Sequence, residues 1–243
     1  MNKYVLFFSK RGYSKYTSHL DMLRLFKRAF RRADIALSYS HGFNPHPQMS
    51  FAQPLSLGYS ACREMLEFST DQAYDTEDIL RRLRGNLAEG MDVSAVLPVH
   101  EKKALAGQVD RADYEIIIPV PYYDRDYSAL IGEFLAQDQI LAMKRQKKSK
   151  ELKEVDIREK IVSMEAAPSE GKEGVGILKR NLLQPNVQLD CGSRSNLSPE
   201  LLLSAFLAFS NLPVERHRIE VCRTCMHFPE DSELEKQFGG MQE

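Results

Sequence analysis

The chain has 243 residues, enough for one large domain or for two domains of about 100–150 residues each. Hydrophobic residues make up 43% and charged residues 28% of it, ordinary values for a soluble globular protein that buries a core. Its 33 Lys and Arg residues nearly balance its 34 Asp and Glu residues. The net charge of −1 therefore excludes no class of partner, because binding depends on how the charges are distributed along the chain.

Several classes of protein and site are excluded by what the sequence lacks. No apolar run approaches the roughly 18–20 residues needed to span a bilayer, and the N-terminus has no cleavage-site pattern, so we expect a cytoplasmic protein without membrane contact. Its four cysteines fit a reducing compartment better than a disulfide framework. There is no P-loop, no Gly-x-Gly-x-x-Gly and no Cys-x3-Cys-x2-Cys, and we predict neither a cofactor nor a metal. A zinc site at Cys222, Cys225 and His227 is disfavoured, since a structural zinc site needs four ligands. We expect the two cysteines to be incidental thiols in a strand or at its end.

The first half of the chain alternates strand and helix patterns. Strand propensity is high over Asn2–Ser9, and apolar residues three and four apart predict a helix that Ser18 and Asp21 cap. The apolar face of that helix is expected to comprise Leu20, Leu23, Phe26, Phe30 and Ala33. Strands are then expected over Ile35–Ser40, Arg63–Thr70 and Met91–Val99, an ordered loop over Gly42–Leu57, and a helix capped by Thr76 over Thr76–Leu87. This order of elements is that of a ferredoxin-like unit.

The second half repeats this order with insertions. Its expected strands are Ala112–Val120, Ile140–Arg145, Val155–Met164, Val175–Leu183 and Arg216–Cys222, and its expected helices are Tyr127–Ala136 and Ser198–Phe209. We therefore predict an α+β fold, a tandem of two ferredoxin-like (βαββαβ) units with antiparallel sheets. The units are expected over residues 1–103 and 104–229, followed by an acidic, frayed tail over residues 230–243.

Basic residues gather in two runs. Eight cations lie between Lys10 and Arg32 with Asp21 as the only acid, a local sum of +7, and Lys144–Lys153 holds six cations against one Glu. Each cation can neutralise one phosphate and release its counterions, which favours binding to nucleic acid. Interleaved aromatic residues, Phe43 among them, can stack on unpaired bases, although some belong to the core. The alternative is that both runs are merely solvated, one as a helix face and the other as a hairpin tip.

A polar cluster follows the first strand. His19 lies in the first helical turn, where the helix dipole favours a neutral imidazole that can act as a base, a metal ligand or a partner for a base edge. Asp21 or Glu64 could orient His19 as a general acid or base. His41, Phe43, Asn44 and His46 lie in a loop whose prolines hold the preceding residues extended, which suggests binding. A Ser–His–Asp triad is disfavoured, because Ser18 is adjacent to His19 in sequence and their side chains diverge on a helix.

Two strings in this region resemble a known family. Ser-His-Leu-Asp at 18–21 and Gly-Phe-Asn-Pro-His-Pro at 42–47, with Glu64 and Val-Asp-Ile-Arg at 155–158, are similar to the uncharacterised radical SAM-linked protein family. The resemblance covers most of the chain. It implies a radical-SAM protein as partner, and it adds Asp156 and Arg158 to the candidate residues, but it implies no activity.

The sequence therefore predicts an RNA-binding accessory module that acts with a radical-SAM enzyme, in tRNA or rRNA modification or processing. The alternatives are an RNA-processing or RNA-modifying enzyme that uses His19, Asp21 and Glu64, and a protein–protein adaptor whose basic face meets an acidic partner. The predicted binding residues are Lys10, Lys15, Ser18, Arg24, Lys27, Arg28, Arg31, Arg32, His41, Phe43, Asn44, His46, Asp156 and Arg158.

Overall fold

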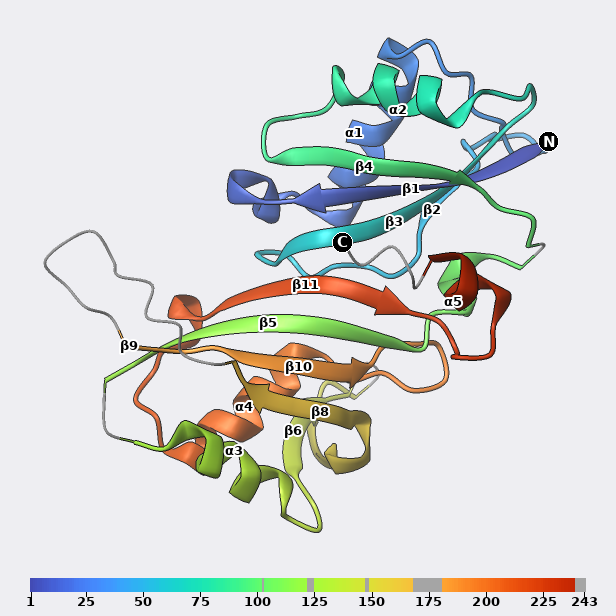
Figure 1. Cartoon of the computed structure of the whole chain (residues 1–243). Helices are drawn as coiled ribbons and strands as arrows, with labels where there is room; N and C mark the ends of the chain where they lie inside the picture. Colours follow the sequence, from blue (N-terminus) through green and yellow to red (C-terminus); the bar gives the residue numbers. More distant parts are fainter. Residues whose placement is uncertain (102, 122–124, 147–148, 168–180, 239–243) are drawn as a thin grey trace, which may run out of the picture. The chain divides into compact units, whose positions relative to one another are not determined.

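The structure is a computed structural model that describes residues 1–101, 103–121, 125–146, 149–167 and 181–238 (Figure 1). Its internal contacts divide the chain into two units. Unit 1 comprises Met1–Asp110 and Arg223–Glu243, and unit 2 comprises Arg111–Cys222. Within the described ranges, each helix is too short or too polar to cross a lipid bilayer.

Unit 1 is built on an antiparallel sheet. Its elements are β1 (Asn2–Lys10), α1 (His19–Arg32), β2 (Met49–Phe51), β3 (Ser60–Thr70), α2 (Thr76–Arg84), β4 (Met91–Pro98), the C-terminal part of β11 (Glu220–His227) and α5 (Glu233–Phe238), with short 3-10 turns at Gly12–Tyr16 and Leu105–Gly107. Strand β1 lies between β3 and β4, β2 pairs with β3, and β11 is the next strand beyond β3.

Both faces of β1 are buried, which explains its unbroken apolar sequence. Alternate side chains point to opposite faces of a strand. Tyr4, Leu6 and Phe8 therefore share a core with α1 and α2, while Phe7 meets the Phe238 ring of α5 edge-on at 5.5 Å.

Helix α1 begins at the predicted cap. The Asp21 amide donates to Ser18 Oγ (3.2 Å), and the Ser18 hydroxyl donates to the Asp21 carboxylate (2.7 Å), so the predicted cap is confirmed. The predicted apolar face is wrong at Leu20, which is 63% exposed. Leu20 lies one turn before Arg24 and so faces the polar side of the helix.

Unit 2 holds further antiparallel strands and a separate hairpin. Its elements are β5 (Arg111–Val120), α3 (Tyr127–Leu135), β6 (Leu141–Arg145), β7 (Leu152–Asp156), β8 (Ile161–Ala166), β9 (Asn181–Leu183), β10 (Pro185–Asp190), α4 (Pro199–Ser210) and the start of β11, with 3-10 turns at Arg158–Lys160 and Arg216–Arg218. Strand β10 lies between β5 and β8, and β9 pairs with the end of β5. Strands β6 and β7 pair only with each other. The aromatic rings of Phe134 on α3 and Phe206 on α4 meet edge-on at 5.3 Å.

The predicted α+β class with antiparallel pairing is confirmed, but two strand predictions and one loop prediction in the first two-thirds of the chain are wrong. Residues 35–40 make only isolated bridges, and a short strand, β2, lies inside the expected loop. The expected strand Val155–Met164 is broken after Asp156, whose carboxylate accepts from the Arg158 amide (2.9 Å) and turns the chain. The predicted cap Thr76 is also wrong, because Asp75 accepts from the Asp78 amide.

The C-terminal third departs further from the prediction. Strand β10 was not expected, and the closing strand is displaced from Arg216–Cys222 to Glu220–His227. Of the expected strand Val175–Leu183, only Asn181–Leu183 lies in the described residues. The tail is not frayed over its described part, because Leu234 and Phe238 of α5 are buried in unit 1.

Candidate functional site

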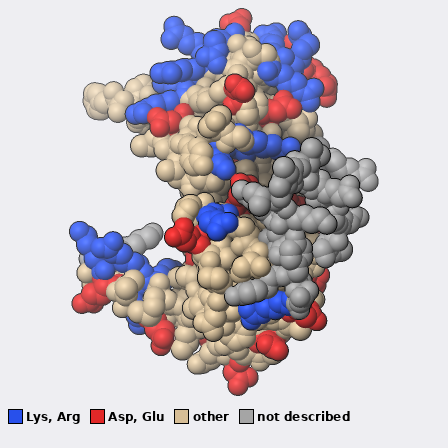
Figure 2. Space-filling view, turned by 90° about the vertical axis from the view of Figure 1, so that its left-hand side faces the viewer, with Lys and Arg blue, Asp and Glu red and all other residues tan. Residues whose placement is uncertain are grey.

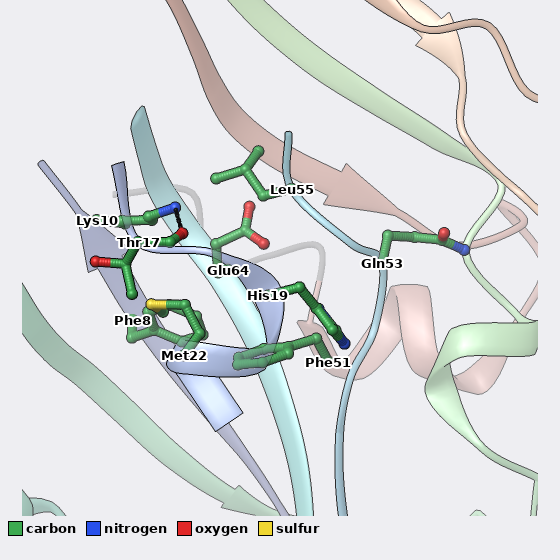
Figure 3. A pocket seen from close by; sticks show the side chains of 9 residues that line it. All are labelled: Phe8, Lys10, Thr17, His19, Met22, Phe51, Gln53, Leu55 and Glu64. Atoms are coloured by element: carbon green, nitrogen blue, oxygen red, sulfur yellow. Dashed lines mark hydrogen bonds between the residues drawn. The ribbon is translucent and has the colours of Figure 1, made fainter. Parts of the chain in front are cut away.

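A small pocket lies beside the start of α1 (Figure 3). Its lining residues come from β1, the start of α1 and the residue before its cap, β2 and the segment after it, and β3: Phe8, Lys10, Thr17, His19, Met22, Phe51, Gln53, Leu55 and Glu64. Its cavity volume is about 20 Å³, which leaves room for one water molecule but not for a nucleobase.

One lining residue of this pocket, Glu64, belongs to a buried ion pair. Arg223 of β11 donates to both oxygens of Glu64, from Nε at 2.7 Å and from a terminal nitrogen at 2.6 Å, and both side chains are at most 3% exposed. Arg223 also donates to the Gln53 carbonyl at 3.0 Å. The bidentate geometry and the extra carbonyl acceptor are what a buried guanidinium requires.

Lys10 is a second cation beside the same carboxylate. It is 2% exposed, and its Nζ donates to the Thr17 carbonyl at 3.1 Å. Burial lowers the pKa of Lys10; Glu64 opposes this shift, and the Arg223 charge adds to it. Two cations and one carboxylate thus share a site that is largely sealed from water.

His19 lies at the exposed rim of the pocket without a carboxylate partner. Its ring stands edge-on to Phe51 at 5.3 Å. No hydrogen bond joins it to Asp21 or Glu64: Glu64 is held by Arg223, and Asp21 is held by Ser18 and by Arg24 at 2.9 Å. Those two contacts, the serine hydrogen bond first, lower the pKa of Asp21. Neither carboxylate therefore orients His19 as the sequence led us to expect.

The predicted binding loop is exposed and separate from the pocket. His41, Asn44 and His46 do not line the pocket, although His46 is fixed by a backbone bond from the Ser40 amide to its carbonyl (2.8 Å). Across the described ranges, no three His, Cys, Asp or Glu side chains are placed to hold a metal ion. His19, His41 and His46 thus form no common centre.

The cations of α1 share one face of the helix. At 3.6 residues per turn, Arg24, Lys27, Arg28, Arg31 and Arg32 fall within about 140° of its circumference. The opposite side carries the buried Met22, Phe26, Ala29 and Phe30. We call these five exposed cations the α1 cationic face. Figure 2 shows Lys and Arg side chains gathered at the helical end of unit 1, the top of the view.

The α1 cationic face is flanked by two shallow hollows. Arg24, Arg28 and Arg32 line the first, together with Leu87 and Ala88 from the segment between α2 and β4. The second, which we call the Tyr39 hollow, is lined by Lys27, Phe30, Arg31, Asp34, Ile35, Ala36, Leu37 and Tyr39. The side chains of Arg28 and Arg31 form no ion pair or hydrogen bond with any residue that the structure describes. Their charge is therefore free for a ligand.

The remaining predicted residues lie elsewhere. Lys15, between β1 and α1, places its Nζ 5.4 Å from the centre of the Tyr16 ring. Asp156 and Arg158 belong to unit 2, where Asp156 accepts from the Ile140 amide (3.0 Å) and Arg158 donates to the Leu135 carbonyl (2.8 Å). These contacts fix both side chains next to the base of the β6–β7 hairpin.

Arg223 is the site residue that sequence reasoning missed. It lies 159 residues from Glu64 in the chain, so no local spacing pairs the two. One signal was present: Val221 and Arg223 are two apart in a strand, so both side chains point to the same buried face. An arginine on the apolar side of a strand requires a buried acceptor.

Comparisons with known proteins identify a family and a fold. A family model described as an uncharacterised protein conserved in bacteria (DUF2344) matches residues 3–199. No curated protein matches the chain. Among solved structures, the chain is similar to one in a crystal structure of a Cbf5-Nop10-Gar1 complex, with 11% identity and a TM-score of 0.50. That match covers 94% of this chain and 50% of the other, so this chain spans about half the length of the structure it matches.

A further solved structure, of an unknown protein from Galdieria sulphuraria, matches with 11% identity and a TM-score of 0.25, over 92% of this chain and 99% of that one. A likeness at that score supports no conclusion. The similarity to the first structure shows a shared α+β fold alone.

Proposed function

The chain belongs to the DUF2344 family of uncharacterised proteins conserved in bacteria, and we propose that it is an RNA-binding accessory module that acts with a radical-SAM enzyme in tRNA or rRNA modification or processing. The observation that carries the RNA-binding part is the α1 cationic face. Five exposed cations lie there on one side of a helix, and the one acid within that helix, Asp21, is already paired with Arg24.

This arrangement suits a phosphate backbone because binding releases the counterions condensed on it. A rigid helix, held against the sheet by its buried side, presents the cations without the entropy cost of ordering a loop. The two hollows beside the helix give a polyanion a place to lie along the cations.

The frame that carries this face supports a further part of the proposal, a ferredoxin-like fold in each unit. In unit 1, β1, α1, β2, β3, α2 and β4 follow one another in the order that this fold requires, and the strands lie in the order β4-β1-β3-β2. In unit 2, β10 lies between β5 and β8, with α3 and α4 as the corresponding helices. Folds of this kind host many functions, so the frame does not by itself indicate RNA.

The radical-SAM partner rests on the sequence resemblance alone. The strings Ser-His-Leu-Asp at 18–21 and Gly-Phe-Asn-Pro-His-Pro at 42–47 carry it. Both strings lie in unit 1, the unit that carries the α1 cationic face. We therefore place RNA binding and the contact with the partner enzyme on the same unit.

The RNA-binding part is tested by titrating the purified protein with tRNA at two salt concentrations. If all five cations contact phosphates, affinity should fall by roughly 100-fold or more between about 50 and about 200 mM salt. Absent or salt-insensitive binding would contradict the proposal. A radical-SAM enzyme that stays bound after nuclease treatment and high salt would instead favour the protein–protein adaptor.

A further inference from the structure

The aromatic residues of unit 1 separate into core and surface. Tyr59 is 3% exposed and Phe51 9%, so both belong to the core. Tyr13 (93%), Tyr39 (46%) and Phe43 (112%) expose their rings to solvent. A single exposed ring is ordinary on a protein surface. Tyr39 differs because it lines a hollow together with two cations of α1.

Lys27 and Arg31 form the cationic wall of the Tyr39 hollow. The Lys27 ammonium lies 5.9 Å from the centre of the Tyr39 ring, within the range of a cation–π contact. Leu37 adds apolar surface, and Asp34 is the one acid among the lining residues. A hollow with a ring and two cations can take a flat aromatic group and an adjoining anion together.

Phe43 is presented by a loop that is closed at its base. An antiparallel bridge joins Tyr39 to Pro47, the Ser40 amide donates to the His46 carbonyl (2.8 Å), and the His46 amide donates to Ser40 Oγ (3.0 Å). Gly42 has φ +122°, a conformation that other residues rarely adopt. The loop thus starts from Tyr39 at its base and carries Phe43 in its exposed segment, with both rings open to solvent.

Unpaired nucleotides match these groups better than a duplex does. In a double helix the faces of the bases are stacked on one another and only phosphates, sugars and base edges are accessible. An unpaired segment offers base faces that stack on aromatic rings while its phosphates meet Lys and Arg. Cations alone would bind either form, so Tyr39 and Phe43 are what distinguish the two.

We propose that the Tyr39 hollow and the adjoining loop hold an unpaired RNA segment, with bases stacked on Tyr39 and Phe43 and phosphates on Lys27 and Arg31. This inference rests on the proposed RNA-binding function and narrows its substrate to RNA with an accessible single-stranded stretch. It assigns the loop over residues 41–46 a role in binding, without a metal.

The test uses the full chain and two probes: a short unstructured RNA, and the same strand annealed to its complement. The wild type should bind the single strand more tightly. Tyr39→Ala and Phe43→Ala should each weaken binding of the single strand by about 5-fold or more, since stacking on one aromatic ring is worth at least that. Neither should change binding of the duplex.

Tyr13→Ala is the matched control, because it removes another solvent-exposed ring, one that does not line the hollow. Thermal unfolding of all three variants should match the wild type, because the altered side chains are exposed. Equal affinity for both probes, no loss on Tyr39→Ala and Phe43→Ala, or an equal loss on Tyr13→Ala would overturn the inference while leaving RNA binding intact. If the wild type binds neither probe, the proposed function fails with it.

Discussion

The most buried charged side chains of unit 1 are Lys10, Glu64 and Arg223. Two of them are cations and only one is an anion. Glu64 accepts from Arg223 at 2.6 and 2.7 Å, whereas the Lys10 ammonium donates to a backbone carbonyl, that of Thr17. Breaking a buried pair costs more than the pair contributes, because it leaves a charge without a partner in a medium of low dielectric constant.

Replacing Glu64 by Gln should therefore lower the free energy of unfolding by about 3–5 kcal/mol. Urea unfolding measures this. Glu233→Gln is the control: the pair of Glu233 with Lys236 is exposed (77% and 63%), so its loss should leave the free energy of unfolding almost unchanged. A similar loss for both variants would show that the buried pair has no special role.

Titration of Lys10 should make the free energy of unfolding depend on pH in the alkaline range. Its pKa in the folded protein lies below the ordinary value of 10.5, because burial disfavours the charged form. Between the two pKa values the unfolded state binds more protons, so the free energy of unfolding rises with pH across that window. We expect the unfolding free energy of the wild type minus that of Lys10→Met to increase as pH approaches 10.5, because only the wild type has this titrating group. A pH-independent difference would contradict the assignment.

The strands of the β6–β7 hairpin carry three cations of the second basic run, and two of these oppose each other. Lys144 and Lys153 are cross-strand partners and both are exposed. Like charges directly opposite on neighbouring strands repel each other. Neither lysine forms an ion pair with a residue in the described ranges.

Lys153→Glu should remove this repulsion and raise the free energy of unfolding of unit 2 by roughly 0.2–1 kcal/mol. Lys144→Glu should do the same, but the double variant should return toward the wild type because it restores like charges. Chemical denaturation of the four proteins completes the cycle. Additive gains in the double variant would argue against cross-strand repulsion.

Local sequence patterns predicted the elements whose causes are local. Ser18 and Asp21 correctly marked the start of α1, and the spacing of Phe26 and Phe30 correctly marked its buried side. The patterns failed where contacts between residues far apart in the sequence determine the structure. Strand β10 is defined by its pairing with β5 and β8, and the ion pair of the candidate site joins residues 159 positions apart.

At the scale of the whole molecule, the C-terminal segment of the chain belongs to unit 1, together with the N-terminal residues. Phe238 of α5 is 3% exposed and packs on Phe7 of β1, and the Arg63 side chain donates to the Phe238 carbonyl at 3.0 Å. The acidic composition of residues 230–243 suggested a frayed tail, because composition does not reveal that Phe238 packs against β1.

Phe238→Ala should therefore loosen unit 1 and leave unit 2 intact. Loss of a buried phenylalanine costs about 3–5 kcal/mol. In native-state hydrogen exchange, amides of β1 and β3 should exchange faster, while those of β10 keep their protection. Phe206→Ala, which removes a buried ring of α4 in unit 2, should give the reverse pattern. Uniform loss of protection in both variants would indicate one cooperative body rather than two units.

RNA binding by the α1 cationic face is the central claim, and the slope of affinity against salt for tRNA tests it most directly. Arg28→Gln removes an unpaired cation of that face, and Arg81→Gln removes one charge from α2, where Arg81 is paired with Asp78.

The slope of log affinity against log salt is negative. We predict that Arg28→Gln makes it shallower by about 0.7–0.9, the value of one phosphate contact. Arg81→Gln should leave the slope unchanged. Wild-type binding that does not depend on salt, or equal slopes for the wild type and Arg28→Gln, would contradict the account.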